Sequence, residues 1–356
     1  MGVGVLNRQA SIVVRRLRGL EAGEEVTQEL LRQRLKVAFA ARSGTYCRAV
    51  HGEQDGLPGI FVDRFGAAAV AIFESVGSSR IQLVVQEELA RWIGKVSLLA
   101  FHRMVSKKEK WAQEGSEFVT DIIKGDGSRV LVEEPPCTFE VDVHHGVAGH
   151  WSFALEELRR DLVGRVVTKG GTALDAWSHV GQWGIRSAVA GAAEVVLLEE
   201  SLGYAKLCRD NVAMNGVEHQ CTVLHRGSVL DELRSMATSG IKFNCVALNV
   251  RVRFERYFKQ REGQFGRWFK PSLKGYATAV ALGAQVTSRG GYLVVSFLLP
   301  INAEHWATSL VKDGLEQATR VGSLVAHSVG VSEDAGLASS AMDDAWTPVL
   351  ICVRLT

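Results

Sequence analysis

Two segments of this chain constrain its fold more than any other part, residues 172–184 and residues 194–201. The first begins as an apolar strand, turns at Gly181 and continues in a helical pattern, and the second is an apolar strand that ends at Glu199. In α/β proteins this arrangement holds a nucleoside, because the backbone of the turn approaches the ligand and the carboxylate binds the ribose hydroxyls. The pattern therefore predicts a Rossmann-like α/β domain.

One position in the turn departs from that pattern. Gln182 stands where a dinucleotide-binding or S-adenosylmethionine (SAM)-binding loop has a second glycine. A side chain there would crowd the methionine end of SAM or demand a strained backbone. The same segment therefore predicts the fold and gives a reason to doubt methyl transfer.

Composition narrows the class of protein. The chain has 356 residues, more than one typical domain, and 47% of them are hydrophobic, which is ample for buried cores. A net charge of +2 is too small for binding of polyanions by the whole surface, so any contact with nucleic acid must come from a local patch. The six cysteines form no Cys-x-x-Cys pair, and we interpret them as reduced packing residues of an intracellular protein. No apolar run approaches the ~20 residues of a membrane-spanning helix.

The amino-terminal segment allows two interpretations. Four arginines precede the first acidic residue, Glu21, which is typical of a mitochondrial presequence. Residues 10–17 are also rich in β-branched residues and predict a strand, which is the interpretation we prefer. The strand interpretation does not exclude import into mitochondria. The expected location is therefore mitochondrial or cytoplasmic, with the mitochondrial one preferred.

Periodicity predicts strands over residues 1–20 and a helix over residues 25–41, with Thr27 as its cap. Two strands with tight turns follow in residues 46–66, then a strand, a helix and a strand over 67–74, 80–93 and 97–104. Paired prolines at 135 and 136 end this part of the chain. The predicted apolar face of the first helix comprises Leu30, Leu31, Leu35, Val37 and Phe39.

From residue 137 onward, strands alternate with helices over short connections. Alternation of this kind predicts a mostly parallel sheet with helices on both faces. The predicted organisation therefore has three segments: residues 1–20 as short strands, residues 21–136 as a small α/β domain, and residues 137–356 as the Rossmann-like domain.

Residues 46–66 resemble the linker-domain signature of the bacterial-type large-subunit rRNA cytosine-5 methyltransferases. The resemblance continues, in order, at residues 107–109, 139–143, 174–184, 205–216, 275–276 and 290–291. It implies a PUA domain, of which residues 1–20 would be the last strands, a small middle domain, and a class I SAM-dependent methyltransferase domain. It also implies a cofactor pocket at Asp175, Ser178, Gly181, Glu199 and Asn249, with Glu199 on the ribose.

The pocket implied by the resemblance lacks several expected groups. Where relatives read the adenine amine with an acidic residue, this chain has residues 225–228, which offer no carboxylate but include Ser228 as a weak substitute. Where relatives end a strand with Asp-Pro-Pro, it has Asn249, Val250 and Arg251. The prolines would fix a loop against the target base, and asparagine removes a negative charge.

The nucleophile is missing as well. Methylation of cytosine at C5 needs a thiolate that adds to C6, and relatives place this cysteine just after the fifth strand. This chain has Ser296 there, with no cysteine nearby. Lys-Thr-Gly and Asp-Gln-Arg motifs are also missing from residues 146–160. Together these losses predict a retained scaffold with no catalytic residue and no bound cofactor.

A basic segment is the candidate RNA-binding site. Residues 251–274 hold eight basic residues against two acidic ones, with aromatic residues interleaved. Cations for phosphates beside aromatic faces for unstacked bases suit structured RNA, although a solvated basic loop over buried aromatics has the same pattern. The basic residues are Arg251, Arg253, Arg256, Lys259, Arg261, Arg267, Lys270 and Lys274. His144, His145 and His150 lack the spacing of a metal site, so no metal is expected.

Three hypotheses follow. The first is a non-catalytic methyltransferase-fold protein that binds rRNA and ribosomal or assembly proteins, as a ribosome component or an assembly factor. The second is an active SAM-dependent RNA methyltransferase with a changed target, such as an amine or a ribose hydroxyl, which needs no cysteine. The third is a protein scaffold, for example half of a heterodimer with another methyltransferase-like chain. We take the first as the main interpretation.

Overall fold

The structure is a computed structural model that describes residues 4–6, 14–16, 26–42, 44–73, 76–106, 116–125, 128–143, 151, 153–250, 270–300, 304–329 and 346–356. Contacts divide the chain into two compact units. The first unit is Met1–Glu133 with Glu140–Phe153, and the second unit is Glu134–Phe139 with Ala154–Thr356. The predicted division into three segments stays a prediction.

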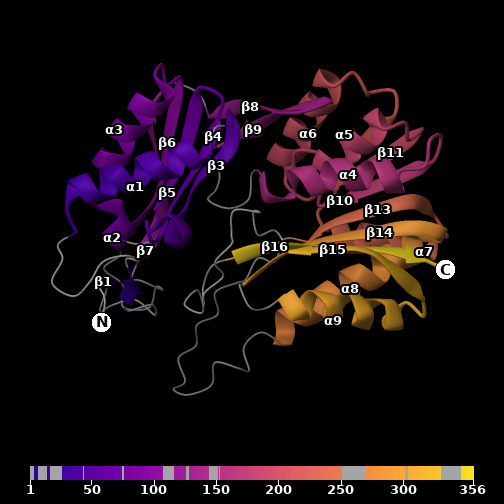
Figure 1. Ribbon diagram of the computed structural model, residues 1–356. Helices are drawn as coiled ribbons and strands as arrows, with labels where there is room; N and C mark the ends of the chain where they lie inside the picture. Colours follow the sequence, from indigo (N-terminus) through magenta and orange to yellow (C-terminus); the bar gives the residue numbers. More distant parts are fainter. Residues whose placement is uncertain are drawn as a thin grey trace. The chain divides into compact units, whose positions relative to one another are not determined.

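The first unit contains a five-stranded sheet of order β3-β4-β5-β6-β7 (Figure 1). Strands β5 and β6 run parallel, and the other neighbours in this sheet are antiparallel. The strands are β3 (Tyr46–His51), β4 (Ile60–Phe65), β5 (Ala68–Phe73), β6 (Leu98–Ser106) and β7 (Ser116–Lys124), and the helices are α1 (Gln28–Ala41), α2 (Val76–Ser79) and α3 (Gln82–Ile93). Two short antiparallel strands, β1 (Gly4–Leu6) and β2 (Val14–Arg16), form a separate ribbon, which agrees with the predicted strands.

Helix α1 begins as the sequence predicts. The Thr27 side chain accepts a hydrogen bond from the Leu30 backbone N–H at 3.2 Å, which satisfies one of the free donors of the first turn. The Phe39 ring stacks on Trp92 of α3 with 4.4 Å between ring centroids, so the two helices share one core. The prediction for Val37 is wrong, because its side chain is 64% exposed. Val37 follows buried Leu35 by two positions, which places it about 200° around the helix from that residue.

The second unit is built on a seven-stranded sheet of order β12-β11-β10-β13-β14-β16-β15. The first five strands of that order run parallel, and β16 and β15 are antiparallel additions. The strands are β10 (Thr172–Ala176), β11 (Glu194–Glu199), β12 (Cys221–His225), β13 (Phe243–Val250), β14 (Thr287–Pro300), β15 (Gly322–Val329) and β16 (Trp346–Leu355). The predicted mostly parallel sheet is confirmed.

Helices cover both faces of this sheet, also as predicted (Figure 1). One face carries α4 (Glu156–Val166), α5 (Gln182–Val189) and α6 (Leu202–Met214). The other carries α7 (Val229–Thr238), α8 (Lys270–Val286) and α9 (Glu304–Gln317). A hairpin of β8 (Arg129–Glu134) and β9 (Cys137–Asp142) precedes α4, and its turn belongs to the second unit. No helix among the described residues is long and apolar enough to cross a membrane.

The close packing of α5 on β11 gives a test of the second unit. A Cβ on Gly184 would lie 2.6 Å from Leu197 Cδ2 and 3.2 Å from Asp175 Cβ. Gly184→Ala should therefore lower the free energy of unfolding by about 1–3 kcal/mol through overpacking. The matched control is Gly203→Ala in α6, where the added methyl group meets only Ser201 Oγ at 3.8 Å. That variant should be neutral or gain up to about 1 kcal/mol. Equal midpoints in urea for the two variants would contradict the packing argument.

Candidate nucleoside-binding site

The loop between β10 and α5 has an unusual backbone. Trp177, His179 and Gly181 all have positive φ, at 56°, 54° and 88°. The first two are not glycines, and each costs about 1 kcal/mol or more in that region. The Ser178 N–H donates to the Leu198 carbonyl at 2.9 Å, and the Gly181 N–H donates to the Ser178 carbonyl at 2.7 Å. Neighbouring backbone therefore holds the loop in a conformation that its residues do not prefer.

Gln182 does not carry the strain that the sequence suggested for it. It is the first residue of α5 and has helical backbone, while Gly181 before it caps the helix in the left-handed region. The expectation of a strained backbone at Gln182 is therefore wrong, because the turn is completed one residue earlier. Its side-chain Nε2 is buried and has no hydrogen-bond partner among the described residues. A buried donor without a partner costs free energy, which a ligand acceptor would recover.

Glu199 lies at the end of β11 beside the loop, and its side chain is largely buried. Its Oε2 accepts a hydrogen bond from the His179 N–H at 2.8 Å, and its Oε1 accepts one from the Ser201 N–H at 2.9 Å. Ser201 is the cap of α6. The carboxyl group thus joins the loop to the next helix, and each oxygen keeps a second lone pair that can accept from a hydroxyl.

Asp175, which is buried, and Asn249, which is partly buried, form a pair near the ends of β10 and β13. Asp175 is 1% exposed. Its Oδ2 accepts from the Gly184 N–H at 2.8 Å, and its Oδ1 accepts from Asn249 Nδ2 at 3.0 Å. Burial raises the pKa of the Asp175 carboxyl group to about 7, against the opposing effect of the Gly184 N–H. An aspartate at 249 would place a second carboxylate against the first, which a buried site disfavours. With Asn249, the pair has one titratable carboxyl group, that of Asp175 on β10.

Ser178 and Gly181 are held from behind by α6. The Ser178 side chain is buried, and burial also raises the pKa of the Cys208 thiol on α6. A Cβ on Gly181 would lie 3.0 Å from Cys208 Sγ and 2.7 Å from Ile185 Cδ1. Glycine is thus required at 181 by both its φ and its neighbours. The five predicted pocket residues lie along one edge of the sheet, at the carboxyl ends of β10, β11 and β13.

Glu200 is a site residue that the sequence analysis missed. Its Oε1 accepts hydrogen bonds from the Val229 N–H at 2.9 Å and from Trp177 Nε1 at 3.3 Å. Ser228, the predicted weak substitute, caps α7 by accepting from the Asp231 N–H at 3.2 Å. A carboxyl group is therefore present next to residue 228, but it comes from Glu200, directly after β11. The signal was the pair of consecutive acidic residues at 199 and 200.

The structure offers no activated thiol. All six cysteines lie in the described residues, and burial raises the pKa of every thiol, so each is protonated at neutral pH. Ser296 on β14 pairs with Asn249 in the register of the sheet. A hydroxyl therefore stands at the strand position next to Asn249.

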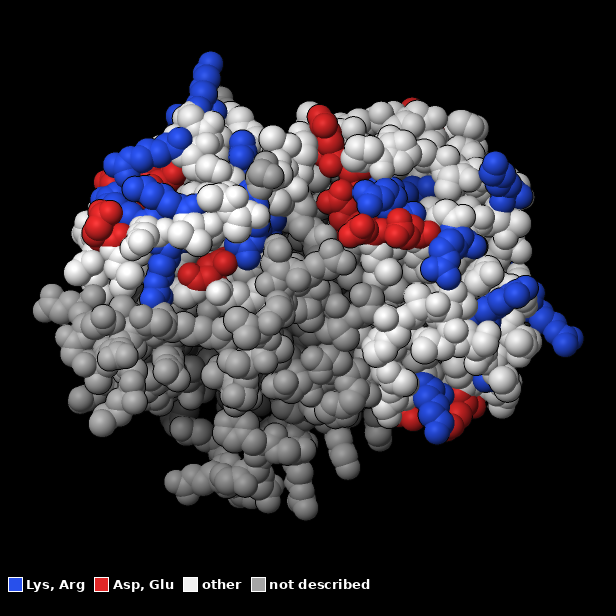
Figure 2. Space-filling model, viewed as in Figure 1, with Lys and Arg blue, Asp and Glu red and all other residues white. Residues whose placement is uncertain are grey.

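The predicted RNA-binding segment falls mostly outside the described residues. Arg251, Arg253, Arg256, Lys259, Arg261 and Arg267 lie there, and so do the side chains of Lys270 and Lys274 within α8. His144, His145 and His150 also lie outside the described residues. On the face drawn in Figure 2, the described Lys and Arg side chains are interspersed with Asp and Glu. The RNA-binding segment therefore stays a prediction.

The chain is similar in sequence to rRNA methyltransferases, although no family model matches it. It is 25% identical over 288 residues to Ribosomal RNA large subunit methyltransferase I of Shewanella denitrificans, covering 80% of this chain and 66% of that protein. It is 25% identical over 304 residues to the Shewanella frigidimarina protein of that name, covering 83% and 72%. It is 23% identical over 249 residues to the Escherichia coli protein of that name, and the match covers 69% of this chain and 59% of that protein. The chain thus spans 59–72% of the length of these relatives.

Solved structures share the fold. SMU.776 complexed with S-adenosylhomocysteine (SAH) matches with a TM-score of 0.76 at 11% identity, covering 99% of this chain and 88% of that one. Trm5b from Pyrococcus abyssi matches at 0.58 and the M. jannaschii tRNA m1G37 methyltransferase at 0.55, both at 13% identity, covering 83% of this chain and 74% of theirs. The predicted Rossmann-like SAM-methyltransferase fold is confirmed.

The buried Asp175 carboxyl group predicts a pH dependence of stability. Its pKa of about 7 lies above the value in the unfolded chain, so the folded state holds the proton more tightly. Raising the pH from about 4 to 7 should therefore destabilise the protein. Asp175→Asn should flatten this slope, because its oxygen can still accept from Gly184 while the Asn249 amide turns over. Urea unfolding at several pH values measures this, with exposed Glu194→Gln on β11 as control. A variant slope equal to that of the wild type would refute this assignment.

Proposed function

We propose that the second unit binds SAM at the loop between β10 and α5, and that the protein methylates RNA. The observation that carries the proposal is the engagement of Glu199 by both the His179 and Ser201 N–H groups. These bonds hold a carboxyl group at the loop in the position where this fold binds a ribose. The names of the sequence relatives and the SAH complex of SMU.776 support SAM as the ligand.

The residues at the loop fit such a ligand. Glu199 would accept from the ribose hydroxyls, and the Gln182 amide, which is buried without a described partner, would donate to the carboxylate of the methionine part. Glu200, beside the start of α7, would lie on the adenine side. When bound, SAM supplies an electrophilic methyl group, so the protein has only to bind, orient and exclude water.

The target we propose is an atom that carries its own lone pair, such as an exocyclic amine or a ribose hydroxyl. A cytosine carbon needs activation by a thiolate, and the thiols of this chain are protonated. An amine or a hydroxyl needs no covalent activation. Asn249 donates its N–H to Asp175, which leaves its carbonyl oxygen to accept a hydrogen bond from such a target.

A second candidate is the interpretation that the sequence alone favoured, a non-catalytic protein that binds rRNA as a ribosome component or an assembly factor. The observation in its favour is Ser296 on β14 opposite Asn249, at the residue where the resemblance implies a cysteine nucleophile. The comparisons favour the active alternative. Ribosomal partners, a heterodimeric partner and a mitochondrial or cytoplasmic location stay proposals.

Glu199→Gln tests the ribose site. The variant keeps the size of the side chain but replaces one acceptor oxygen with a donor that faces a backbone N–H. Loss of a charge-assisted hydrogen bond should weaken SAH binding by about 10- to 100-fold, as measured by titration calorimetry. Exposed Glu194→Gln, on the same strand, should bind as the wild type does. Equal affinity for the two variants would remove the main support for the proposal.

Methyl transfer separates the two candidates. Deproteinised rRNA incubated with tritiated SAM and the wild-type protein should become labelled. Binding of SAH without label, on rRNA and on assembling ribosomal particles, would favour the non-catalytic candidate. Absence of both SAH binding and label would overturn the proposed function. A label at cytosine C5 would contradict the proposed target class.

The basic segment should carry the RNA contact. Replacing Arg256, Lys259 and Arg261 with glutamine removes three charges and should lower the slope of log affinity against log salt by about 2 for single-stranded RNA. A matched control replaces three exposed cations of the second unit, Arg160, Arg234 and Lys312. Filter binding at several salt concentrations measures both slopes. Equal slopes for the two triple variants would place the RNA elsewhere.

A further inference from the structure

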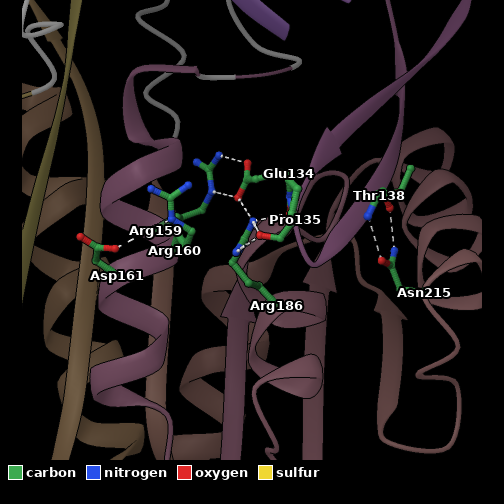
Figure 3. Close-up of polar contacts among 8 residues, drawn as sticks. All are labelled: Glu134, Pro135, Thr138, Arg159, Arg160, Asp161, Arg186 and Asn215. Atoms are coloured by element: carbon green, nitrogen blue, oxygen red, sulfur yellow. Dashed lines mark hydrogen bonds and ion pairs between the residues drawn. The ribbon is translucent and has the colours of Figure 1, made fainter. Parts of the chain in front are cut away.

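Three charged side chains are buried together beside the turn of the β8–β9 hairpin (Figure 3). Glu134 and Arg159 are each 1% exposed, and Arg186 is 4% exposed. Glu134 Oε2 lies 2.6 Å from Arg159 Nη2, and its Oε1 lies 2.8 Å from Arg186 Nη2. Arg186 also donates to the backbone carbonyls of Glu134 at 2.6 Å and Pro135 at 3.3 Å. The hairpin turn is thereby fixed to α5, the helix that carries Arg186.

Because Arg186 belongs to α5, contacts that hold Arg186 in place also hold this helix, which directly follows the candidate nucleoside loop. Arg186 lies one turn after Gln182, and Gly181 caps the same helix. The Gly184 N–H of that first turn donates to Asp175. Because α5 is only two turns long, restraint at Arg186 also restrains its first turn.

A second route runs from the turn through α6. The Thr138 N–H donates to Asn215 Oδ1 at 3.0 Å, and Asn215 Nδ2 donates back to the Thr138 carbonyl at 2.7 Å (Figure 3). Asn215 Nδ2 also donates to the Asn211 carbonyl at 2.8 Å. Asn211, which is fully buried, donates through Nδ2 to the Val180 carbonyl at 3.0 Å. Val180 is a residue of the loop itself, so side-chain amides connect the hairpin turn with the loop.

We infer that the hairpin turn Glu134–Phe139 is a positioning element for the candidate nucleoside loop, acting through Arg186 on α5 and through Asn215 and Asn211 on α6. The loop holds two non-glycine residues in the left-handed region, and such a backbone persists only when surrounding structure determines it. The turn restrains α5, which follows the loop, and α6, which contacts the loop through Asn211, and so pre-organises the loop for a ligand. Arg186, Asn211 and Asn215 are positioning residues in this account. The effect on ligand binding rests on the proposed function, whereas the effect on the rigidity of the loop does not.

Asn215→Ala and Arg186→Met each cut one of the two routes, and Asn211→Leu removes the last link to Val180. Each should make amide hydrogen exchange about tenfold faster at residues 177–184, the effect of one net buried hydrogen bond, and weaken SAH binding by a similar factor. Gln220→Ala is the matched control. Its side-chain amide donates to the Ala192 carbonyl at 2.8 Å. Ala192 comes after α5, at the end of that helix away from the loop. That variant should leave exchange in the loop unchanged.

Exchange in β14, residues 287–297, separates positioning from general destabilisation. Faster exchange confined to residues 177–184 supports the inference. Equal acceleration in the loop and in β14, or no change in the loop, overturns it, since either result means that the cluster acts only on global stability or not at all. If wild-type protein fails to bind SAH while loop exchange still responds to Asn215→Ala, the inference holds and the proposed function fails. If SAH binds wild type and variants alike, with unchanged exchange, the proposed function holds and the inference fails.

Discussion

The candidate site depends on the hydrogen bonds that the Glu199 side chain accepts from the His179 and Ser201 N–H groups. The loop before α5 contains two non-glycine residues with positive φ, and these conformations cost free energy that other contacts must offset. Glu199 provides one such contact from β11, and Asn211 provides another from α6 through the Val180 carbonyl. A carboxyl group that fixes the loop is also fixed by it, so the same bonds that stabilise the backbone orient the acceptor for a ligand.

The Asp175–Asn249 pair shows why motif positions cannot be judged one at a time. Taken alone, Asn249 is the loss of a carboxylate that the resemblance implies. In the structure its amide donates to the buried Asp175, so the neighbouring strand supplies a carboxyl group. Glu200 does the same beside Ser228, where the sequence analysis found no carboxylate. At two positions where the resemblance implies a missing carboxylate, a neighbouring carboxyl group is thus present, which weakens the sequence argument for a non-catalytic scaffold.

Local patterns predicted much of the fold because their causes are local. Helix α1 with its Thr27 cap and the alternation from β10 to α6 both follow from periodicity and capping within about 15 residues. The contacts of the hairpin turn were not predicted, because the residues that they join are 25 to 77 positions apart in the chain. Helix α7 and the edge strand β15 were missed too. The strand exposes large residues such as Leu324, so its pattern is not that of a buried strand.

Cofactor binding and target activation are separable parts of methyl transfer, and this chain departs from the pattern that the resemblance implies mainly in the second. The groups that would hold the nucleoside, Glu199, Gly181 and Glu200, lie together at the ends of the parallel strands. Ser296 stands where the resemblance implies the group that would activate a cytosine carbon, and the thiols of the chain are protonated. A thiolate is needed only where the methyl acceptor is an unactivated carbon, since nitrogen and oxygen acceptors carry their own lone pairs. The missing cysteine therefore argues against one class of target atom, and by itself it does not argue against catalysis.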